Sequence, residues 1–469
     1  MSVNRLNKIA LRSLYFLFFL LFNTHCFSQN RNFERAKIID SLTVANSNET
    51  FALYLPESFN ENEETAIVFI FEPVARGKVG IMPFIEASEK YNYILVCSNN
   101  SRNGPFNTNL QIFTRLSNVM FTTFKIKEDE VYTAGFSGGA RFATALAVLN
   151  DGIRGVVGCG AGFPSNRLNF LTMSHTFNYV GLVGNRDMNY QEVLEFGDFL
   201  TSYKVGNEII TSQDNHKWPS SKDVLRAFNW LELQAYKDNI KNIDESVIHS
   251  TFTNTYTLGT ELEKVKAFEL AVWEYERALR NFSKYYKTDS VFNKVKSLKY
   301  LKEYKKVLRV NAKIKTLEDK IRNEFGIRFY EKMKSSKPIL DEIWWKKRIE
   351  KNIMTYFSAA DIKYQYMAER LEYAVFAMAI EESYGFSANS ELQKRIYCHE
   401  LITVLRPERP FPFVRLAMDY AIRNDKDKVI ELLKTAVAKG FSNKDFIVNN
   451  NEFSKYKDDA DFKSFLESL

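Results

Sequence analysis

Short apolar segments alternate with helical stretches from residue 51 to about residue 238, and this alternation limits the fold of the first half more than any other feature. Such an alternation is typical of a mostly parallel sheet that carries helices on both faces. The first half is therefore expected to be an α/β domain. Strands are predicted at residues 51–55, 66–71, 93–97, 131–134, 155–158, 179–183 and 208–211, and amphipathic helices at residues 107–125, 190–203 and 224–236.

After residue 238 the apolar pattern takes the helical period. A capping box at Thr260 and Glu263 opens the most regular stretch, whose apolar stripe runs to Phe282. Within residues 408–469, two short helices resemble a single tetratricopeptide-type repeat followed by a cap, while a plain helical bundle is the alternative. The remaining helices are expected at residues 297–325, 343–357, 359–382 and 390–405, and the final pair at residues 413–422 and 428–438.

Length and composition set the broad class. The chain of 469 residues is long enough for two or three domains of about 100–200 residues, and its 45% hydrophobic content is ample for cores. The formal net charge of +7 is small for this length, and lysines are interspersed with acids along the second half. This pattern indicates solvated helix faces and not a nucleic-acid-binding stripe. We expect an α/β domain over residues 29–240 and an all-α domain over residues 241–469.

The N-terminus has the features of a secretory signal peptide. Three basic residues precede nine apolar residues at 14–22, a run shorter than the roughly 20 residues of a membrane-spanning helix. Small residues before the cleavage point favour a signal peptide of residues 1–28 that leaves Gln29 first. The alternative is a lipid anchor on Cys26, whose neighbours lack the lipobox pattern. We therefore expect an exported protein, periplasmic or secreted, with no transmembrane segment.

One short motif carries most of the chemical information. Residues 135–139 read Gly-Phe-Ser-Gly-Gly, which fits the G-x-S-x-G pattern, between a predicted strand and a helix-like segment at residues 141–149. In a nucleophile elbow the serine lies on a strained strand-to-helix turn that tolerates only small neighbours. Ser137 is therefore the candidate nucleophile, while an ordinary tight turn near a helix N-terminus is the alternative interpretation.

A serine hydroxyl needs a base to take its proton and a carboxylate to orient that base. In chains with this elbow the acid and the histidine follow the serine, on loops after later strands. Asp187 lies directly after the predicted strand at 179–183, and His216 lies in the loop after the last predicted strand. Ser137, Asp187 and His216 are therefore the candidate catalytic triad.

Elimination favours His216 as the base, because the chain has only five histidines. Asp198 and Asp214 are rival acids, but the first falls on an amphipathic stretch and the second is two residues from the histidine. The remaining alternatives are an ordinary turn acid at Asp187 and a loop histidine packed on Trp218. The other four histidines fit less well. His25 leaves with the signal peptide, and His175 precedes the strand that carries the acid. His249 and His399 lie outside the α/β domain.

An oxyanion hole needs N–H donors beside the nucleophile. The backbone N–H of Gly138 is the first candidate, and the second should come from the loop after the strand at 66–71. Many hydrolases have His-Gly in that loop, whereas this chain has Glu-Pro-Val-Ala-Arg-Gly at residues 72–77. Because proline has no N–H, Val74 is the nearest candidate donor. Loss of one donor typically costs about 10²- to 10³-fold in rate, so a faulty hole would leave a slow enzyme.

The combined motifs resemble a known family. Gly-Phe-Ser-Gly-Gly followed by Arg141, Gly-x-x-Asp at 184–187 and His-x-Trp-Pro at 216–219 resemble exported esterases related to polyhydroxyalkanoate depolymerases and feruloyl esterases. The resemblance covers roughly the first half of the mature chain. It implies an α/β-hydrolase sheet and hydrolysis of a carboxylic ester through an acyl-enzyme formed on Ser137. Nothing in the family carries over to the all-α helical domain that is expected to follow the sheet. The missing His-Gly is a departure from this family.

Other chemistries find no support in the sequence. No cluster of histidine, cysteine or acidic residues has metal-ligand spacing, and no Gly-rich phosphate loop follows a strand, so no metal or other cofactor is expected. Cys97, Cys159 and Cys398 indicate no disulfide framework. The connection at residues 160–178 is too short for a large inserted lid, which predicts an open site.

Three functions are compatible with these features. The leading prediction is an exported serine hydrolase that cleaves an ester-bearing substrate. The second is a hydrolase-fold scaffold without useful catalysis, which binds a protein partner through its helical domain. A serine peptidase is the third, since the same triad cleaves amides. None of the three involves nucleic acid.

Overall fold

The structure is a computed structural model that describes residues 33–163 and 176–467. The predicted signal peptide with Cys26, the histidine at position 175 and most of the 160–178 connection lie outside the described residues. Residues Ala36–Leu469 form one compact unit. Within the described ranges, no helix has the length and apolar character needed to cross a membrane.

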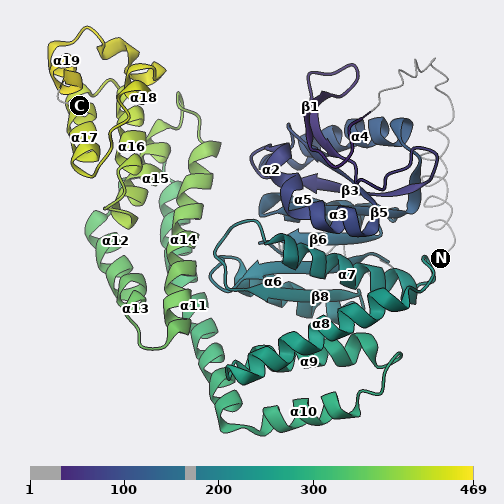
Figure 1. Cartoon of the computed structure of the whole chain (residues 1–469). Coiled ribbons are helices and arrows are strands. Elements are labelled where there is room, and N and C mark those ends of the chain that lie inside the picture. Colours follow the sequence, from purple (N-terminus) through teal and green to yellow (C-terminus); the bar gives the residue numbers. More distant parts are fainter. Residues whose placement is uncertain (1–32, 164–175, 468–469) are drawn as a thin grey trace, which may run out of the picture. The chain divides into compact units, whose positions relative to one another are not determined.

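An eight-stranded sheet organises the first half, with its strands in the order β1-β2-β4-β3-β5-β6-β7-β8 (Figure 1). The β1–β2 and β2–β4 pairs are antiparallel and the other neighbouring pairs are parallel. All seven predicted strands are present, and β1 was not predicted. The bounds are β1 Ile39–Thr43, β2 Thr50–Tyr54, β3 Thr65–Phe71, β4 Tyr93–Ser98, β5 Ile126–Phe136, β6 Gly155–Cys159, β7 Asn178–Gly184 and β8 Asn207–Ser212.

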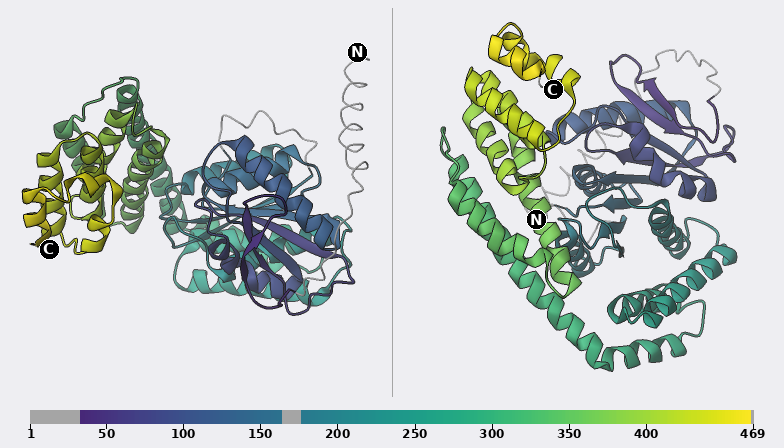
Figure 2. Two further views of the ribbon diagram at one scale, coloured as in Figure 1. Left: turned by 90° about the horizontal axis from the view of Figure 1, so that it is seen from above. Right: turned by 60° about the vertical axis from the view of Figure 1, so that its left-hand side comes forward.

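Helices cover both faces of this sheet, as the views in Figures 1 and 2 show. Apolar contacts place each helix on its face, and the helices predicted at 107–125, 190–203 and 224–236 are all present. One face carries α2 (Gly77–Ile81), η1 (Met82–Phe84), α3 (Ile85–Tyr91) and α7 (Ser221–Lys237). The other face carries α4 (Phe106–Thr123), α5 (Gly138–Leu149) and α6 (Tyr190–Ser202).

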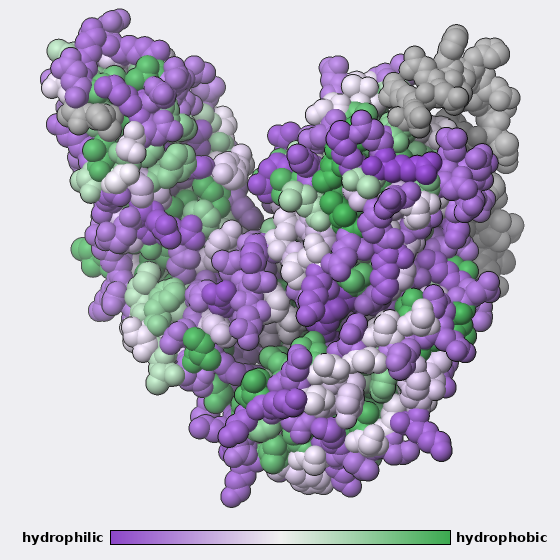
Figure 3. Space-filling view, viewed as in Figure 1, coloured by the Kyte–Doolittle hydropathy of each residue, from purple (hydrophilic) through white to green (hydrophobic). Residues whose placement is uncertain are grey.

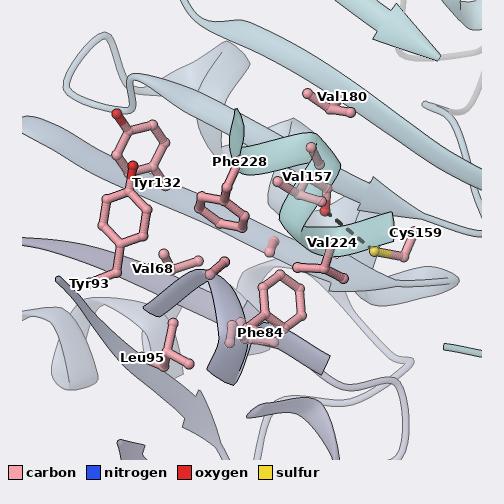
Figure 4. Close-up of a cluster of buried hydrophobic side chains, with 14 of the residues drawn as sticks. Val68, Phe84, Tyr93, Leu95, Tyr132, Val157, Cys159, Val180, Val224 and Phe228 are labelled. Carbon is pink, nitrogen blue, oxygen red and sulfur yellow. Dashed lines mark hydrogen bonds between the residues drawn. The ribbon is translucent and has the colours of Figure 1, made fainter. Parts of the chain in front are cut away.

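Alternate residues of the central strands form a core beneath α3 and α7. The rings of Tyr93 and Tyr132 lie 5.4 Å apart within it. Full burial of one large apolar side chain contributes about 1.5–3 kcal/mol, so this core holds the strand ends rigidly. Figure 4 shows the cluster, whose strand and helix members include Val68, Leu95, Val157, Val180, Phe84 and Phe228.

Every described element after α7 is helical, so the change from sheet to helices falls close to the predicted boundary at residue 240. The assignment of two separate domains stays a prediction. The elements are α8 Glu245–Lys264, α9 Phe268–Phe282, α10 Asp289–Tyr300, α11 Lys302–Met333, α12 Glu342–Ile349, η3 Glu350–Met354, α13 Thr355–Phe357, α14 Ile362–Gly385, α15 Leu392–Leu405, α16 Phe411–Ile422, α17 Lys426–Ala438, α18 Lys444–Val448, η4 Asn451–Tyr456 and α19 Ala460–Glu467.

The predicted capping box is wrong. Thr260 lies inside α8, where its hydroxyl donates to the carbonyl oxygen of Tyr256 at 3.0 Å, as is usual in a helix interior. The Glu263 carboxylate accepts a hydrogen bond from the Tyr275 hydroxyl at 2.7 Å and does not reach back to a helix N-terminus. The chain turns at Lys266, which has a φ of 60°, and the next helix begins afterwards. The stretch that was predicted as one helix to Phe282 therefore belongs to two helices, α8 and α9.

The C-terminal helices share a separate apolar core. Val414 of α16, Leu433 of α17 and Phe462 of α19 are buried together in it. The resemblance of the α16–α17 pair to a tetratricopeptide repeat stays a prediction. On the face seen in Figure 3, hydrophilic residues cover most of the surface and hydrophobic residues occur in small groups.

A buried arginine joins the helices to the edge of the sheet. Arg277 of α9 has a side chain that is 9% exposed and lies between the carboxylates of Glu208 and Glu274. Its Nη2 donates to the carbonyl oxygen of Ile209 on β8 at 2.7 Å. The pairing offsets the cost of burying the charge, which would be large for an unpaired group.

Candidate active site

Ser137 lies at the sharp turn between β5 and α5. Its φ of 53° and ψ of −121° are rare for a residue with a side chain, so the turn stores strain. A Cβ on Gly139 would lie 2.1 Å from the carbonyl oxygen of Phe71, and one on Gly135 would lie 2.4 Å from the backbone of Gly139. Only glycine fits at these two positions. The Ser137 N–H donates to the carbonyl oxygen of Cys159 at 2.8 Å, which fixes the turn.

Asp187 lies in the acid loop, defined here as residues 184–189, which follows β7. Its own N–H donates to the carbonyl oxygen of Gly184 at 3.0 Å, and its Oδ1 accepts the N–H of Asn189 at 2.8 Å. The residue is 1% exposed. The loop therefore holds a buried carboxylate in a fixed orientation at the carboxyl edge of the sheet.

The loop after β8 carries His216 and is bound to the acid loop. The backbone N–H groups of Asn185 and Arg186 donate to the carbonyl oxygens of Ser212 and Asp214 at 2.9 and 3.0 Å. The Arg186 side chain adds two bonds to the Gln213 carbonyl oxygen, at 3.1 Å from Nε and 2.8 Å from Nη2. The two loops are thereby held in one arrangement.

The structure brings the three candidate side chains into one hydrogen-bonded chain. His216 Nε2 lies 3.0 Å from Ser137 Oγ, and His216 Nδ1 lies 2.9 Å from both carboxylate oxygens of Asp187. The histidine side chain is 7% exposed. Its ring packs on Phe136 at a centroid distance of 4.6 Å. These are the distances that proton transfer from a serine through an oriented imidazole requires.

Neither rival acid lies at the histidine. Asp198 is exposed on α6. Asp214 Oδ1 lies 2.7 Å from the Lys217 ammonium, and this hydrogen bond lowers the pKa of the Asp214 carboxyl. Of the other described histidines, His249 lies on α8 and His399 on α15, outside the sheet.

Ser137 opens onto a cleft of about 1120 Å³. Phe106, Phe142 and Phe163 line it from the α/β side. The expectation of an open site considered only the 160–178 connection, and it omitted a wall that the second half supplies. That wall is a row of residues on α14, namely Tyr373, Phe376, Ala377, Ile380, Glu381 and Tyr384. The Tyr373 ring lies 5.4 Å from the His216 ring, so α14 reaches this hydrogen-bonded chain.

The prediction of Val74 as a free oxyanion donor is wrong. Its N–H donates to Oε2 of Glu72 at 2.8 Å. The Glu72 side chain is fully buried and also accepts the Arg76 N–H at 3.0 Å and the Arg76 Nε at 3.1 Å. A buried carboxylate takes any N–H within reach, because leaving its charge unpaired is costly. The loop after β3 therefore satisfies its own acid and offers no N–H at Val74 to a substrate.

Gly138 and Asn103 are two candidate donors on the cleft wall. Both line the cleft, and no hydrogen bond from the Gly138 N–H occurs within the described ranges. A Cβ on Gly138 would lie 1.9 Å from Oδ1 of Asn103, so the asparagine amide packs directly on this glycine. The Asn103 side chain makes no hydrogen bond to another described residue either. Sequence analysis missed it, although a polar residue shortly after β4 lies at the same sheet edge as the triad.

Three solved structures are similar to part of this chain. An S-formylglutathione hydrolase (FrmB) from Staphylococcus aureus is 16% identical and covers 42% of this chain and 96% of its own, with a TM-score of 0.35. A ferulic acid esterase is 15% identical, with 42% and 98% covered and a TM-score of 0.34. The fluorophosphonate-binding serine hydrolase FphF from S. aureus is 13% identical, with 42% and 97% covered and a TM-score of 0.33.

The strand order, the elbow between β5 and α5, and the acid and the histidine on the loops after β7 and β8 are the features of an α/β-hydrolase fold. These three solved structures match less than half of the chain. No protein-family model matches the sequence, and no curated protein does. The described residues include no group of three histidine, cysteine or acidic side chains able to hold a metal ion.

Proposed function

We propose that the protein is a serine hydrolase that cleaves a carboxylic ester through an acyl-enzyme. The observation that carries this proposal is the continuous hydrogen-bonded chain from Ser137 through His216 to Asp187, which opens onto a large cleft. A buried chain of this kind on a strained elbow has a cost in stability, which is typical of catalytic sites.

In the first step Ser137 Oγ attacks the ester carbonyl carbon while His216 Nε2 takes the hydroxyl proton. Asp187 holds the imidazole by Nδ1 and stabilises its positive charge. The carbonyl oxygen becomes an oxyanion, which accepts hydrogen bonds from the Gly138 N–H and the Asn103 amide. The alcohol leaves with the proton from His216, and water then repeats the sequence to release the acid.

The cleft favours an ester with a bulky apolar or aromatic group. Apart from His216 and Phe136, six aromatic side chains from both halves of the chain line the cleft. Apolar walls of this kind bind a ligand by burying its surface. The six are Phe106, Phe142, Phe163, Tyr373, Phe376 and Tyr384.

The test is acyl transfer to Ser137. Purified protein should react with a fluorophosphonate probe and hydrolyse a p-nitrophenyl ester, and Ser137→Ala should abolish labelling and reduce turnover by roughly 10⁴-fold or more. Ser202→Ala, at an exposed serine on α6, is the matched control and should change neither. Labelling or hydrolysis that survives in Ser137→Ala would refute the assignment. Preference for peptides over esters would make the protein a peptidase.

One observation favours a second candidate, a hydrolase-fold scaffold of little or no activity. The N–H expected in the oxyanion hole, that of Val74, is held by Glu72. Wild-type protein that folds, keeps the Ser137 environment and shows neither labelling nor turnover would support this alternative.

We also propose that the protein is exported, on the basis of the basic and apolar N-terminal segment. Mass spectrometry of protein from its native host should find Gln29 as the first residue. A diacylglycerol-modified Cys26 would indicate a lipid anchor, and an intact N-terminus would contradict export.

A further inference from the structure

Two arginines of the second half donate hydrogen bonds to the acid loop. Arg370 of α14 donates from Nη1 to the carbonyl oxygen of Asn185 at 2.7 Å. Arg322 of α11 donates from Nη2 to the carbonyl oxygen of Met188 at 2.6 Å. These two carbonyl groups lie on either side of Asp187, so the loop is held at both ends from helices far along the chain.

One buried carboxylate aligns both arginines. Glu318 of α11 is 0% exposed and accepts from Arg370 Nε at 3.1 Å and from Arg322 Nη2 at 2.9 Å. The Arg370 side chain is itself only 4% exposed. The Glu318–Arg370 pair is strongly restrained, because moving Arg370 would leave charge unpaired in a buried environment.

The same face of α14 also contacts Arg186 and His216. Glu369, next to Arg370, lies 3.4 Å from Arg186 Nη1, and Arg186 in turn binds the loop that carries the catalytic histidine. One turn later, Tyr373 packs beside His216. The contacts thus run along one side of a single helix and reach the acid loop and the histidine.

We propose that Arg370 and Arg322, aligned by Glu318, are positioning residues that fix the acid loop so that Asp187 stays within hydrogen-bond distance of His216. The effect of this positioning on the reaction rate rests on the proposed function. Catalytic groups must be held to within about 0.5 Å, and a displacement of about 1 Å from a distant change costs roughly 10²-fold in rate. The second half of the chain therefore belongs to the catalytic apparatus.

Arginine is required at position 370 because its planar fork serves two acceptors at once. Nε and Nη2 face Glu318 while Nη1 faces Asn185. A lysine has one ammonium group, which keeps the ion pair with Glu318 and gives up the carbonyl contact. Arg370→Lys therefore removes the contact with the acid loop and preserves the buried charge pair.

Arg277→Lys is the matched control. Arg277 is also buried, is also paired with carboxylates (two, where Arg370 has one) and also donates to a backbone carbonyl oxygen of the α/β half, but that carbonyl belongs to Ile209 within β8. Both variants lose the same kind of contact and should lose similar stability. Only Arg370→Lys should change catalysis.

The experiment compares wild type and both variants in the full chain, with p-nitrophenyl ester kinetics and thermal unfolding. We expect Arg370→Lys to lower kcat about 10- to 100-fold with little change in KM, since the cleft walls stay in place. Arg277→Lys should keep kcat within about twofold at a similar loss in Tm. Equal kcat in the two variants at equal stability would overturn the inference.

Hydrogen exchange supplies a readout independent of activity. The amides of residues 185–190 should exchange faster in Arg370→Lys than in wild type, and Arg277→Lys should leave them unchanged. If wild type neither labels nor hydrolyses, the proposed function fails, and the exchange comparison still decides the positioning role. Should Arg370→Lys not fold, Arg322→Lys carries the same test, because that side chain is 30% exposed and its loss is better tolerated.

Discussion

The described residues include two histidine–aspartate pairs, one at the edge of the sheet and one among the C-terminal helices. In the first, His216 Nδ1 lies 2.9 Å from Asp187, and in the second, His399 Nδ1 lies 2.5 Å from Asp419. Both pairs are buried, with histidine side chains that are 7% and 5% exposed. By the geometry of the pair alone, the second is as good as the first.

The two pairs differ in what lies beyond the histidine. His216 Nε2 has a serine hydroxyl at 3.0 Å, whereas His399 Nε2 has no hydrogen-bond partner in the described ranges. Asp419 also accepts from Arg395 Nε at 2.7 Å, which makes it the centre of a structural ion-pair network between α15 and α16. An oriented histidine becomes a candidate base only where the fold places a strained nucleophile beside it.

The largest expected effect separates the two histidines. His216→Ala should lower kcat/KM for a p-nitrophenyl ester by roughly 10⁴- to 10⁶-fold with little change in Tm. His399→Ala should leave kcat/KM within about twofold and cost about 1–3 kcal/mol of unfolding free energy, because it removes a buried, charge-assisted hydrogen bond. Kinetics and chemical denaturation of both variants measure this. Folded His399→Ala protein without activity would contradict the distinction.

A smaller effect tests the proposed oxyanion donor Asn103, which lies beside the first pair. Asn103→Ala should reduce kcat about 10²- to 10³-fold with KM nearly unchanged, since the amide is needed only once the oxyanion forms. Steady-state kinetics measure the split. Asn107→Ala, at an exposed asparagine on α4, is the control. Unchanged kcat in Asn103→Ala would contradict the assignment of Asn103 as the second donor.

The smallest effect concerns stability near the second pair. Burial raises the pKa of Glu400, the neighbour of His399, above its usual value of 4.5. Because the folded-state pKa is the higher one, the group's contribution to stability is fully present below the unfolded pKa and is lost as pH rises through the folded-state pKa. Glu400→Gln keeps an acceptor for the Tyr420 hydroxyl, which now lies 3.0 Å from the carboxylate.

Glu400→Gln should therefore match wild type near pH 4 and exceed its unfolding free energy at pH 7 by less than about 1 kcal/mol. Urea denaturation at the two pH values measures the difference. The same difference at both pH values would show that titration of this group is not its cause.

Much of the α/β fold could be predicted from the sequence, because the central strands are continuous apolar runs. The strand at Ile39–Thr43 was missed because it is an antiparallel edge strand of mostly exposed residues, which carries no apolar signal. The break between α8 and α9 was missed because the apolar stripe continues across it. Periodicity reports which side chains are buried, and it does not report where a helix ends.

The site divides in the same way. Ser137, Asp187 and His216 lie together where strand order and loop position predicted, since each follows a strand of one parallel sheet. The prediction for Val74 failed because its N–H donates to the buried carboxylate of Glu72, two residues away. That contact depends on the conformation of the loop, which the sequence does not show. The roles of Arg322 and Arg370 could not be predicted from the sequence. Each contacts a residue 134 or 185 positions away, and no local sequence pattern distinguishes either arginine from other helical arginines.

The carbonyl contacts of Arg322 and Arg370 limit how this protein can be divided. A chain cut after α7 would keep every residue of the serine relay, yet the backbone oxygens of Asn185 and Met188 would face solvent and the aromatic row of α14 would be gone. Engineering that transplants the α/β half onto another scaffold must therefore carry α11 and α14 with it. Under the proposed function, random substitutions that impair catalysis should accumulate on those helices as well as around the elbow.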